Sequence, residues 1–147
     1  MRYLMTVLFA LAFTLPQAAN AESGVCTHNG STMNVSVHAG GGPTKVLITY
    51  IRPRRTIADQ GAYDGTEFFR GTMARGRDQT ITGNAHIFSA KCGAIPYRVS
   101  GEMNRAGTLL TLSGDAPVLD DNCRVRSYRD NSNAELVFSC PDGIQVD

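Results

Sequence analysis

The amino-acid sequence predicts an all-β fold: a small antiparallel eight-stranded up-and-down barrel that is held by two disulfides. Two observations lead to this prediction. Apolar and polar residues alternate in short segments, and clusters of Gly, Pro, Asn and Asp separate these segments at roughly ten-residue spacing. Leu is scarce after residue 21 and Trp is absent, which argues against a helical bundle. A β-sandwich is the second choice, because only a closed barrel removes the exposed strand edges.

The first 21 residues have the pattern of a secretory signal peptide. Arg2 precedes an apolar run over residues 3–15, and Ala19-Asn20-Ala21 is a small-residue cleavage pattern. We expect cleavage after Ala21, with residues 22–147 forming one barrel domain that is periplasmic or secreted. The apolar run is too short to span a bilayer comfortably, so we expect no transmembrane anchor after cleavage.

The strands are predicted as consecutive hairpins. In the first strand, Met33, Val35 and Val37 alternate with polar residues, and Gly40-Gly41-Gly42-Pro43 ends it. The later strands are expected at residues 45–52, 67–74, 79–90, 97–103, 109–113, 124–128 and 135–139. In the strand at 79–90, Ile87 is expected on one face and His86 and Phe88 on the other. A helix within residues 56–63 stays open.

All four cysteines follow the expected cleavage point, an even number in an oxidising compartment. If the barrel closes, Cys26 before the first strand and Cys140 at the end of the last become neighbours, which leaves Cys92 to pair with Cys123. If the final hairpin is taken alone, Cys123 lies opposite Cys140 instead. We favour the first connectivity, because cross-linking distant segments removes more entropy from the unfolded chain.

Few residues are candidates for catalysis. The candidate bases are His28, His38 and His86, and none of them stands in a motif that would activate a serine or cysteine. The pair Asp120-Asp121 is typical of a solvated turn. There is no C-x-x-C motif and no close Cys/His pairing of the kind that binds zinc. We therefore expect no enzymatic activity, no metal and no cofactor.

Arginine is over-represented after residue 21, where only Lys45 and Lys91 are lysines. Basic and acidic residues balance in residues 22–147, so we expect no nucleic-acid partner. A guanidinium group recognises carboxylate, phosphate or sulfate with two parallel hydrogen bonds. Two clusters would share one rim if their strands pair: Arg52, Arg54 and Arg55, then Arg70, Arg75 and Arg77. Solvated surface arginines are the alternative interpretation.

Adjacent residues of a strand face opposite sides, so either Phe68 or Phe69 is expected to be exposed. A core that is covered on both sides by loops is the alternative. The predicted binding rim consists of Arg52, Arg54, Arg55, Phe69 and Arg70.

Several blocks of the chain carry a family resemblance: residues 28–33 (HNGSTM), 48–54 (ITYIRPR), 65–71 (GTEFFRG), 91–101 (KCGAIPYRVSG), 114–117 (GDAP) and 123–125 (CRV). They resemble a family of small exported alphaproteobacterial proteins of uncharacterised function, whose domain also occurs as a tail on caspase-like peptidases. The resemblance implies a bacterial, exported, non-catalytic accessory domain and assigns no site residue. A looser, architectural similarity links the predicted fold to the periplasmic C-type lysozyme inhibitors, whose sequence motif is absent here.

We expect a binding or accessory protein that recognises an anionic glycan, a lipid headgroup or a protein surface through the arginine-rich rim. One alternative is a proteinaceous inhibitor of a periplasmic or host hydrolase, and another is a small hydrolase that uses one of the histidines. The sequence leaves open whether side chains fill the barrel or whether it holds one small molecule.

Overall fold

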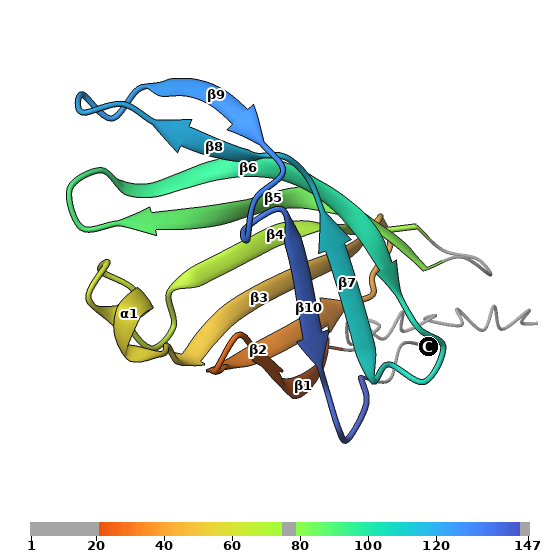
Figure 1. Ribbon diagram of the computed structural model, residues 1–147. Coiled ribbons are helices and arrows are strands. Elements are labelled where there is room, and N and C mark those ends of the chain that lie inside the picture. Colours follow the sequence, from red (N-terminus) through yellow and green to blue (C-terminus); the bar gives the residue numbers. More distant parts are fainter. Residues whose placement is uncertain (1–20, 75–78, 145–147) are drawn as a thin grey trace, which may run out of the picture.

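The computed structural model describes residues 21–74 and 79–144 and contains a closed antiparallel β-barrel (Figure 1). Residues 1–20 of the predicted signal peptide, together with Arg75 and Arg77, lie outside the described residues. The helix of the described part is far too short to cross a bilayer.

Neighbouring strands of the barrel follow the order β1-β10-β7-β6-β5-β4-β3-β2, and β8 and β9 form a separate two-stranded sheet. Within the described residues, the elements are β1 (Ala21–His28), β2 (Ser31–His38), β3 (Thr44–Arg52), α1 (Arg55–Ala58), β4 (Glu67–Met73), β5 (Thr80–Ser89), β6 (Gly93–Met103), β7 (Leu109–Ser113), β8 (Ala116–Leu119), β9 (Val125–Arg129) and β10 (Glu135–Ser139).

The prediction of an eight-stranded antiparallel barrel with two disulfides is confirmed, but the barrel uses one strand that was not predicted and excludes one that was. β1 completes the barrel between β2 and β10. The predicted strand at 124–128 corresponds to β9, which pairs with β8 outside the barrel. The chain is therefore an up-and-down barrel with a hairpin inserted between its last two strands.

Side chains fill the lumen of the barrel. Met33, Val35 and Val37 of β2 point inward, as their alternation predicts. The largest completely buried side chains come from strands all around the barrel: Phe69, Phe138, Met33, Ile48, Ile81, Leu110 and Leu112. An eight-stranded barrel is just wide enough for such a core.

A shift in register in β4 places two adjacent phenylalanines inside the barrel. Phe69 lies opposite Ile48 of β3, whereas the next pair joins Glu67 to Thr49, so Phe68 has no partner in β3. A bulge of this kind re-aims the side chain of the extra residue. Phe69 is completely buried and Phe68 is 5% exposed, so the expectation that one of them is exposed is wrong.

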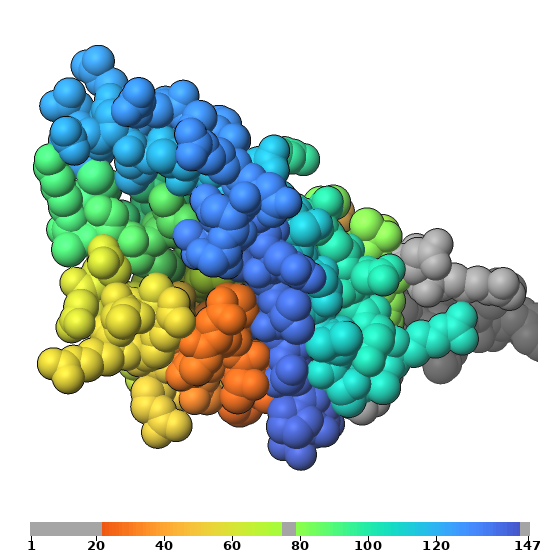
Figure 2. Space-filling model, in the orientation of Figure 1, coloured from red at the N-terminus to blue at the C-terminus, as the bar shows by residue number. Residues whose placement is uncertain are grey.

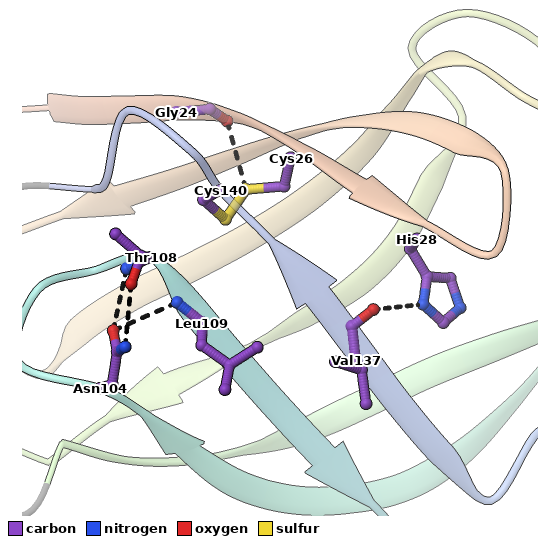
Figure 3. Close-up of a disulfide and its surroundings, with 8 residues drawn as sticks. All are labelled: Gly24, Cys26, His28, Asn104, Thr108, Leu109, Val137 and Cys140. Carbon is purple, nitrogen blue, oxygen red and sulfur yellow. Dashed lines mark hydrogen bonds between the residues drawn. A yellow bond between two sulfur atoms is a disulfide. The ribbon is translucent and has the colours of Figure 1, made fainter.

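The barrel closes between β1 and β10 with little hydrogen bonding. Only Thr27 and Ser139 are paired along this seam, whereas β1 and β2 are paired over their full lengths. The disulfide between Cys26 and Cys140 lies at the seam (Figure 3). This bond and the bond between Cys92 and Cys123 are the connectivity that we favoured from the sequence.

At the end of the barrel away from α1, Ile144 completes the seam. Its backbone N–H donates to the Gly107 carbonyl over 3.0 Å, and its side chain is 3% exposed. A Cβ atom on Gly24 would lie 2.7 Å from Cγ1 of Ile144, so only glycine allows this close approach.

The β8–β9 hairpin leans outward from the barrel and is tied at its tip (Figure 1). The disulfide between Cys92 and Cys123 joins this tip to the β5–β6 turn, and Nζ of Lys91 donates to the Asp121 carbonyl beside it. Oδ1 of Asp120 accepts hydrogen bonds from the backbone N–H groups of Asn122 and Arg124, at 2.9 Å each. Asp120 therefore organises a turn, as the sequence predicts.

Candidate functional site

A pocket of about 370 Å³ opens at the end of the barrel where α1 lies. Its walls come from the β1–β2 turn, the ends of β3 and β5, α1, the starts of β4 and β6, and the segment that leads into β10. Figure 2 shows this end of the molecule, where the yellow segment around α1, the orange β1–β2 turn and the blue segment before β10 surround a hollow. Because the lumen below is filled, the pocket is confined to the mouth of the barrel.

An aromatic cluster forms the inner part of the pocket. The ring of Tyr50 meets the rings of Phe68 and Phe88 edge to face, with centroids 5.7 Å apart in both pairs. Phe88, which was expected on the polar face of its strand, therefore faces the pocket. The imidazole of His28 stacks on Phe138 at 4.6 Å and lies 5.5 Å from Phe68. These contacts give the pocket a rigid apolar floor.

The His28 side chain is buried and hydrogen-bonded through both ring nitrogens. Nδ1–H donates to the Val137 carbonyl over 2.9 Å (Figure 3), and Nε2 accepts from the amide of Asn29 over 3.3 Å. Burial lowers the pKa of His28 most, the Arg54 guanidinium lowers it further, and the bond to Val137 opposes both. The neutral tautomer with a proton on Nδ1 satisfies both partners.

Two tyrosines contribute hydroxyl groups that stay protonated. Burial raises the pKa of Tyr50 above its usual value and raises the pKa of Tyr97 to about 12. The Tyr97 hydroxyl donates to the backbone carbonyl of Asn133, which ties β6 to the segment before β10. Within the described part of the chain, the Tyr50 hydroxyl has no hydrogen-bond partner, and it is available to a ligand.

Two further hydrogen bonds hold the remaining walls of the pocket. The backbone N–H of Arg54 donates to Oγ of Ser31 over 2.9 Å, which fixes the α1 segment to the β1–β2 turn. Oε1 of Gln60 accepts from the backbone N–H of Ala90 over 3.0 Å, which fixes the same segment to the β5–β6 turn. The wall segments are therefore joined to one another independently of any ligand.

Arg54 is the only permanently charged residue among the described residues that line the pocket. No carboxylate lines it, and the described residues provide no ion pair for the Arg54 guanidinium. Its charge acts on both His28 and Tyr50. It adds to the lowering of the His28 pKa, and it opposes the effect of burial, which raises the pKa of Tyr50. The arrangement is that of an anion-recognising group beside an aromatic floor.

The structure divides the predicted binding rim. Arg52, Arg54 and Arg55 are all exposed, and of the three only Arg54 lines the pocket. Arg70 lies opposite Leu47, five residues along β3 from Arg52, or roughly 17 Å at the rise of a strand. Its Nε donates to Oε2 of Glu67 over 3.0 Å. Arg70 therefore shares no rim with Arg52, Arg54 and Arg55, and the other two arginines of its cluster, Arg75 and Arg77, lie outside the described residues.

Phe69 lies in the core and is replaced at the pocket by its neighbour Phe68. Sequence reasoning named His28 and His86 only as candidate bases, and it did not point to Asn29, Tyr50 or Gln60 as pocket residues. His28 and Tyr50 lie at inward-facing positions at the ends of strands, and the Asn29-Gly30 pair after His28, a common hairpin turn, is the one signal that could have located this end of the barrel.

Comparisons with protein families, with curated proteins and with solved structures found no match. The assignment of a function therefore depends on the geometry of the pocket.

Proposed function

We propose that this protein is an exported, non-catalytic binding protein that holds a small anionic solute in the mouth of its barrel. The observation that carries the proposal is the Arg54 guanidinium, which has no ion pair within the described residues and lies in a pocket to which those residues contribute no carboxylate. An unpaired guanidinium can bind an anionic ligand without first breaking an ion pair within the protein. Its planar geometry also suits an anion that accepts two parallel hydrogen bonds.

The pocket geometry supports a small ligand. A volume of about 370 Å³ is at the lower end of the range for ligand pockets, roughly 300–1,000 Å³. Completely buried side chains fill the lumen, among them Met33, Ile48, Phe69 and Leu110. The lumen therefore leaves no channel for an acyl chain. This favours a solute over the tail of a lipid.

The state of His28 supports binding over hydrolysis. Both of its ring nitrogens form hydrogen bonds within the protein. The described residues also place no carboxylate in the pocket that could orient the imidazole of His28 or of His86 as a base. Export is supported by the two disulfides, which persist in oxidising compartments.

A thermal-shift experiment with a panel of small anions tests the proposal. The panel contains acetate, benzoate, citrate, D-galacturonate, D-glucuronate and glucose 6-phosphate. We expect at least one anion to raise Tm, because a ligand at a hundredfold its Kd stabilises the folded state by about 2.7 kcal/mol. The shift should shrink between 50 and 500 mM NaCl, since salt screens the exposed Arg54 guanidinium.

Arg54→Gln should abolish the shift, and Arg55→Gln is the matched control. Arg55 carries the same charge on the same segment and does not line the pocket, so its replacement should leave the shift nearly unchanged. The proposal is wrong if no anion shifts Tm, or if both variants respond as the wild type does.

A further inference from the structure

Ten of the sixteen residues that line the pocket have polar side chains without a permanent charge. Amides and hydroxyls can each donate and accept hydrogen bonds. A ligand that consists of an anionic group and an apolar ring would leave these groups without partners, and unpaired polar groups in a bound pocket weaken binding. The lining therefore suits a ligand that carries several hydroxyl groups.

Three amides around the pocket retain free hydrogen-bonding capacity in the described structure. Gln60 uses only its oxygen, as the acceptor for Ala90, so its NH₂ group is free. Asn29 uses only its NH₂ group, as the donor to His28, so its oxygen is free. The side-chain amide of Asn133 makes no hydrogen bond within the described residues, whereas its backbone N–H donates to Asn131 over 2.8 Å. Donors and acceptors are thus both presented to a ligand, from three different wall segments.

The aromatic floor and Arg54 add two further requirements. The rings of Tyr50, Phe68 and Phe88, whose faces carry partial negative charge, suit a ligand ring with an apolar C–H face, such as a pyranose. Arg54 supplies one guanidinium group, and the described residues add no second permanent cation to the pocket. This matches a monoanion such as a carboxylate better than a dianionic phosphate.

We infer that the pocket binds a hexuronic acid, either free or as the end residue of an anionic glycan. The inference rests on the proposed function and specifies its ligand. Arg54 holds the carboxylate, the amides of Gln60, Asn29 and Asn133 bind the ring hydroxyls, and the aromatic floor packs against the C–H face of the sugar.

Isothermal titration calorimetry with matched sugars tests the inference. D-Galacturonate and D-glucuronate are compared with D-galactose and D-glucose, which differ from them only in having CH₂OH in place of the carboxylate. Benzoate serves as a carboxylate on a ring without hydroxyls. We expect at least one uronate to bind at least tenfold more tightly than its neutral hexose and at least tenfold more tightly than benzoate.

Two variants separate recognition of the charge from recognition of the hydroxyls. Arg54→Gln should lower affinity for the uronate at least tenfold and leave any affinity for the neutral hexose within about twofold, whereas Arg55→Gln should change neither. Asn133→Ala keeps the backbone carbonyl that binds Tyr97 and should weaken uronate binding about fivefold without changing benzoate binding.

The outcomes distinguish the inference from the function on which it rests. If benzoate, citrate or glucose 6-phosphate binds in an Arg54-dependent way and the uronates do not, the sugar-acid inference is overturned and the anion-binding function stands. If a uronate binds equally well to the wild type and to Arg54→Gln, the assignment of this pocket is overturned. If no anion binds, both proposals are overturned.

Discussion

The imidazole of His28 links the pocket to the closure of the barrel. It lies in β1, donates to the Val137 carbonyl of β10 and stacks on Phe138 of the same strand. A second proton on the ring would leave Nε2–H facing the NH₂ group of Asn29, a donor against a donor. Together with burial and the Arg54 charge, this contact makes the folded protein favour neutral His28.

At the residue scale, we predict that His28 makes stability depend on pH. Its pKa is lowered in the folded state, so the unfolded chain binds the proton more readily. The unfolding free energy should therefore be constant above the unfolded pKa near 6.5 and should fall below it, by at most about 1.4 kcal/mol per pH unit for this one group. Urea unfolding at pH 7.5, 6.0 and 5.0 measures the slope.

Two single variants, one at each of two histidines, test this prediction and provide its control. His28→Asn retains a donor for the Val137 carbonyl and removes the titration, so the slope between pH 6.5 and 5 should flatten, at a cost of about 1–3 kcal/mol for the lost ring. His38→Asn changes an exposed residue at the end of β2 and should keep the wild-type slope. An unchanged slope in His28→Asn would mean that another group carries the pH dependence.

At the element scale, the β8–β9 hairpin is the part of the fold that depends most on its tethers. The strands have four and five residues, and none of the β9 side chains is buried. A two-stranded hairpin with so little core is marginally stable in water. The disulfide between Cys92 and Cys123 and the Lys91–Asp121 hydrogen bond hold its tip to the β5–β6 turn.

We therefore predict that removing this disulfide loosens the hairpin locally. In Cys92→Ser/Cys123→Ser, amide hydrogens of β8 and β9 should exchange at least tenfold faster. Without the disulfide, the tip of the hairpin is free to separate from the β5–β6 turn, so local opening costs less free energy. Amides of β2 and β3 should gain no local opening, so their exchange should change only by the loss of global stability, since that pairing does not involve the hairpin. Hydrogen-exchange mass spectrometry checks both segments, and unchanged exchange in β8 and β9 would contradict the tether.

At the scale of the whole molecule, stability depends on closing the barrel where its hydrogen bonding is weakest. β5 and β6 are paired over ten positions, but β1 and β10 are paired at one. The disulfide between Cys26 and Cys140, the His28–Val137 hydrogen bond and the packing of Ile144 on Gly24 replace the missing ladder. The first of these links residues 114 positions apart, which is nearly the length of the domain.

We predict that Cys26→Ser/Cys140→Ser lowers the unfolding free energy by about 4–5 kcal/mol, because the link restricts a long loop of the unfolded chain. The same argument gives about 3–4 kcal/mol for Cys92→Ser/Cys123→Ser, whose cysteines are 31 positions apart. Denaturant unfolding of both variants under non-oxidising conditions measures the two losses. A larger loss for the second pair would contradict the assignment of the first as the closure of the barrel.

The class of fold and the strands whose inward positions are apolar can be predicted from local patterns in the amino-acid sequence. Met33, Val35 and Val37 alternate cleanly, and a period of two places them on one face whatever lies beside them. For the disulfides the sequence left two connectivities open, and the favoured one is confirmed, because closing the barrel brings the ends of the chain together. Of the pocket, only Arg54 was among the predicted binding residues, since local arginine clustering carries no information on register.

The tertiary structure decided which strands close the barrel. β1 escaped prediction because the inward positions of this segment hold Gly24, Cys26 and His28, while its exposed position holds Val25, which reverses the usual pattern. β9 is not part of the barrel. β10 contributes the buried side chains of Leu136 and Phe138 to the core, whereas none of the β9 side chains is buried. Which strand occupies a given place in the barrel depends on how well each candidate strand pairs and packs there. The outcome therefore cannot be predicted from any single segment.

The tertiary structure also decided the content of the pocket. A bulge between two strands turned Phe68 inward beside Phe69, and the register of β3 against β4 separated Arg70 from Arg54. The pocket gathers His28, Tyr50, Gln60 and Asn133, which are spread over more than 100 residues of the sequence. Their proximity comes from barrel closure and strand register, which are long-range pairings, whereas alternation and turn chemistry are local and can be seen in the sequence.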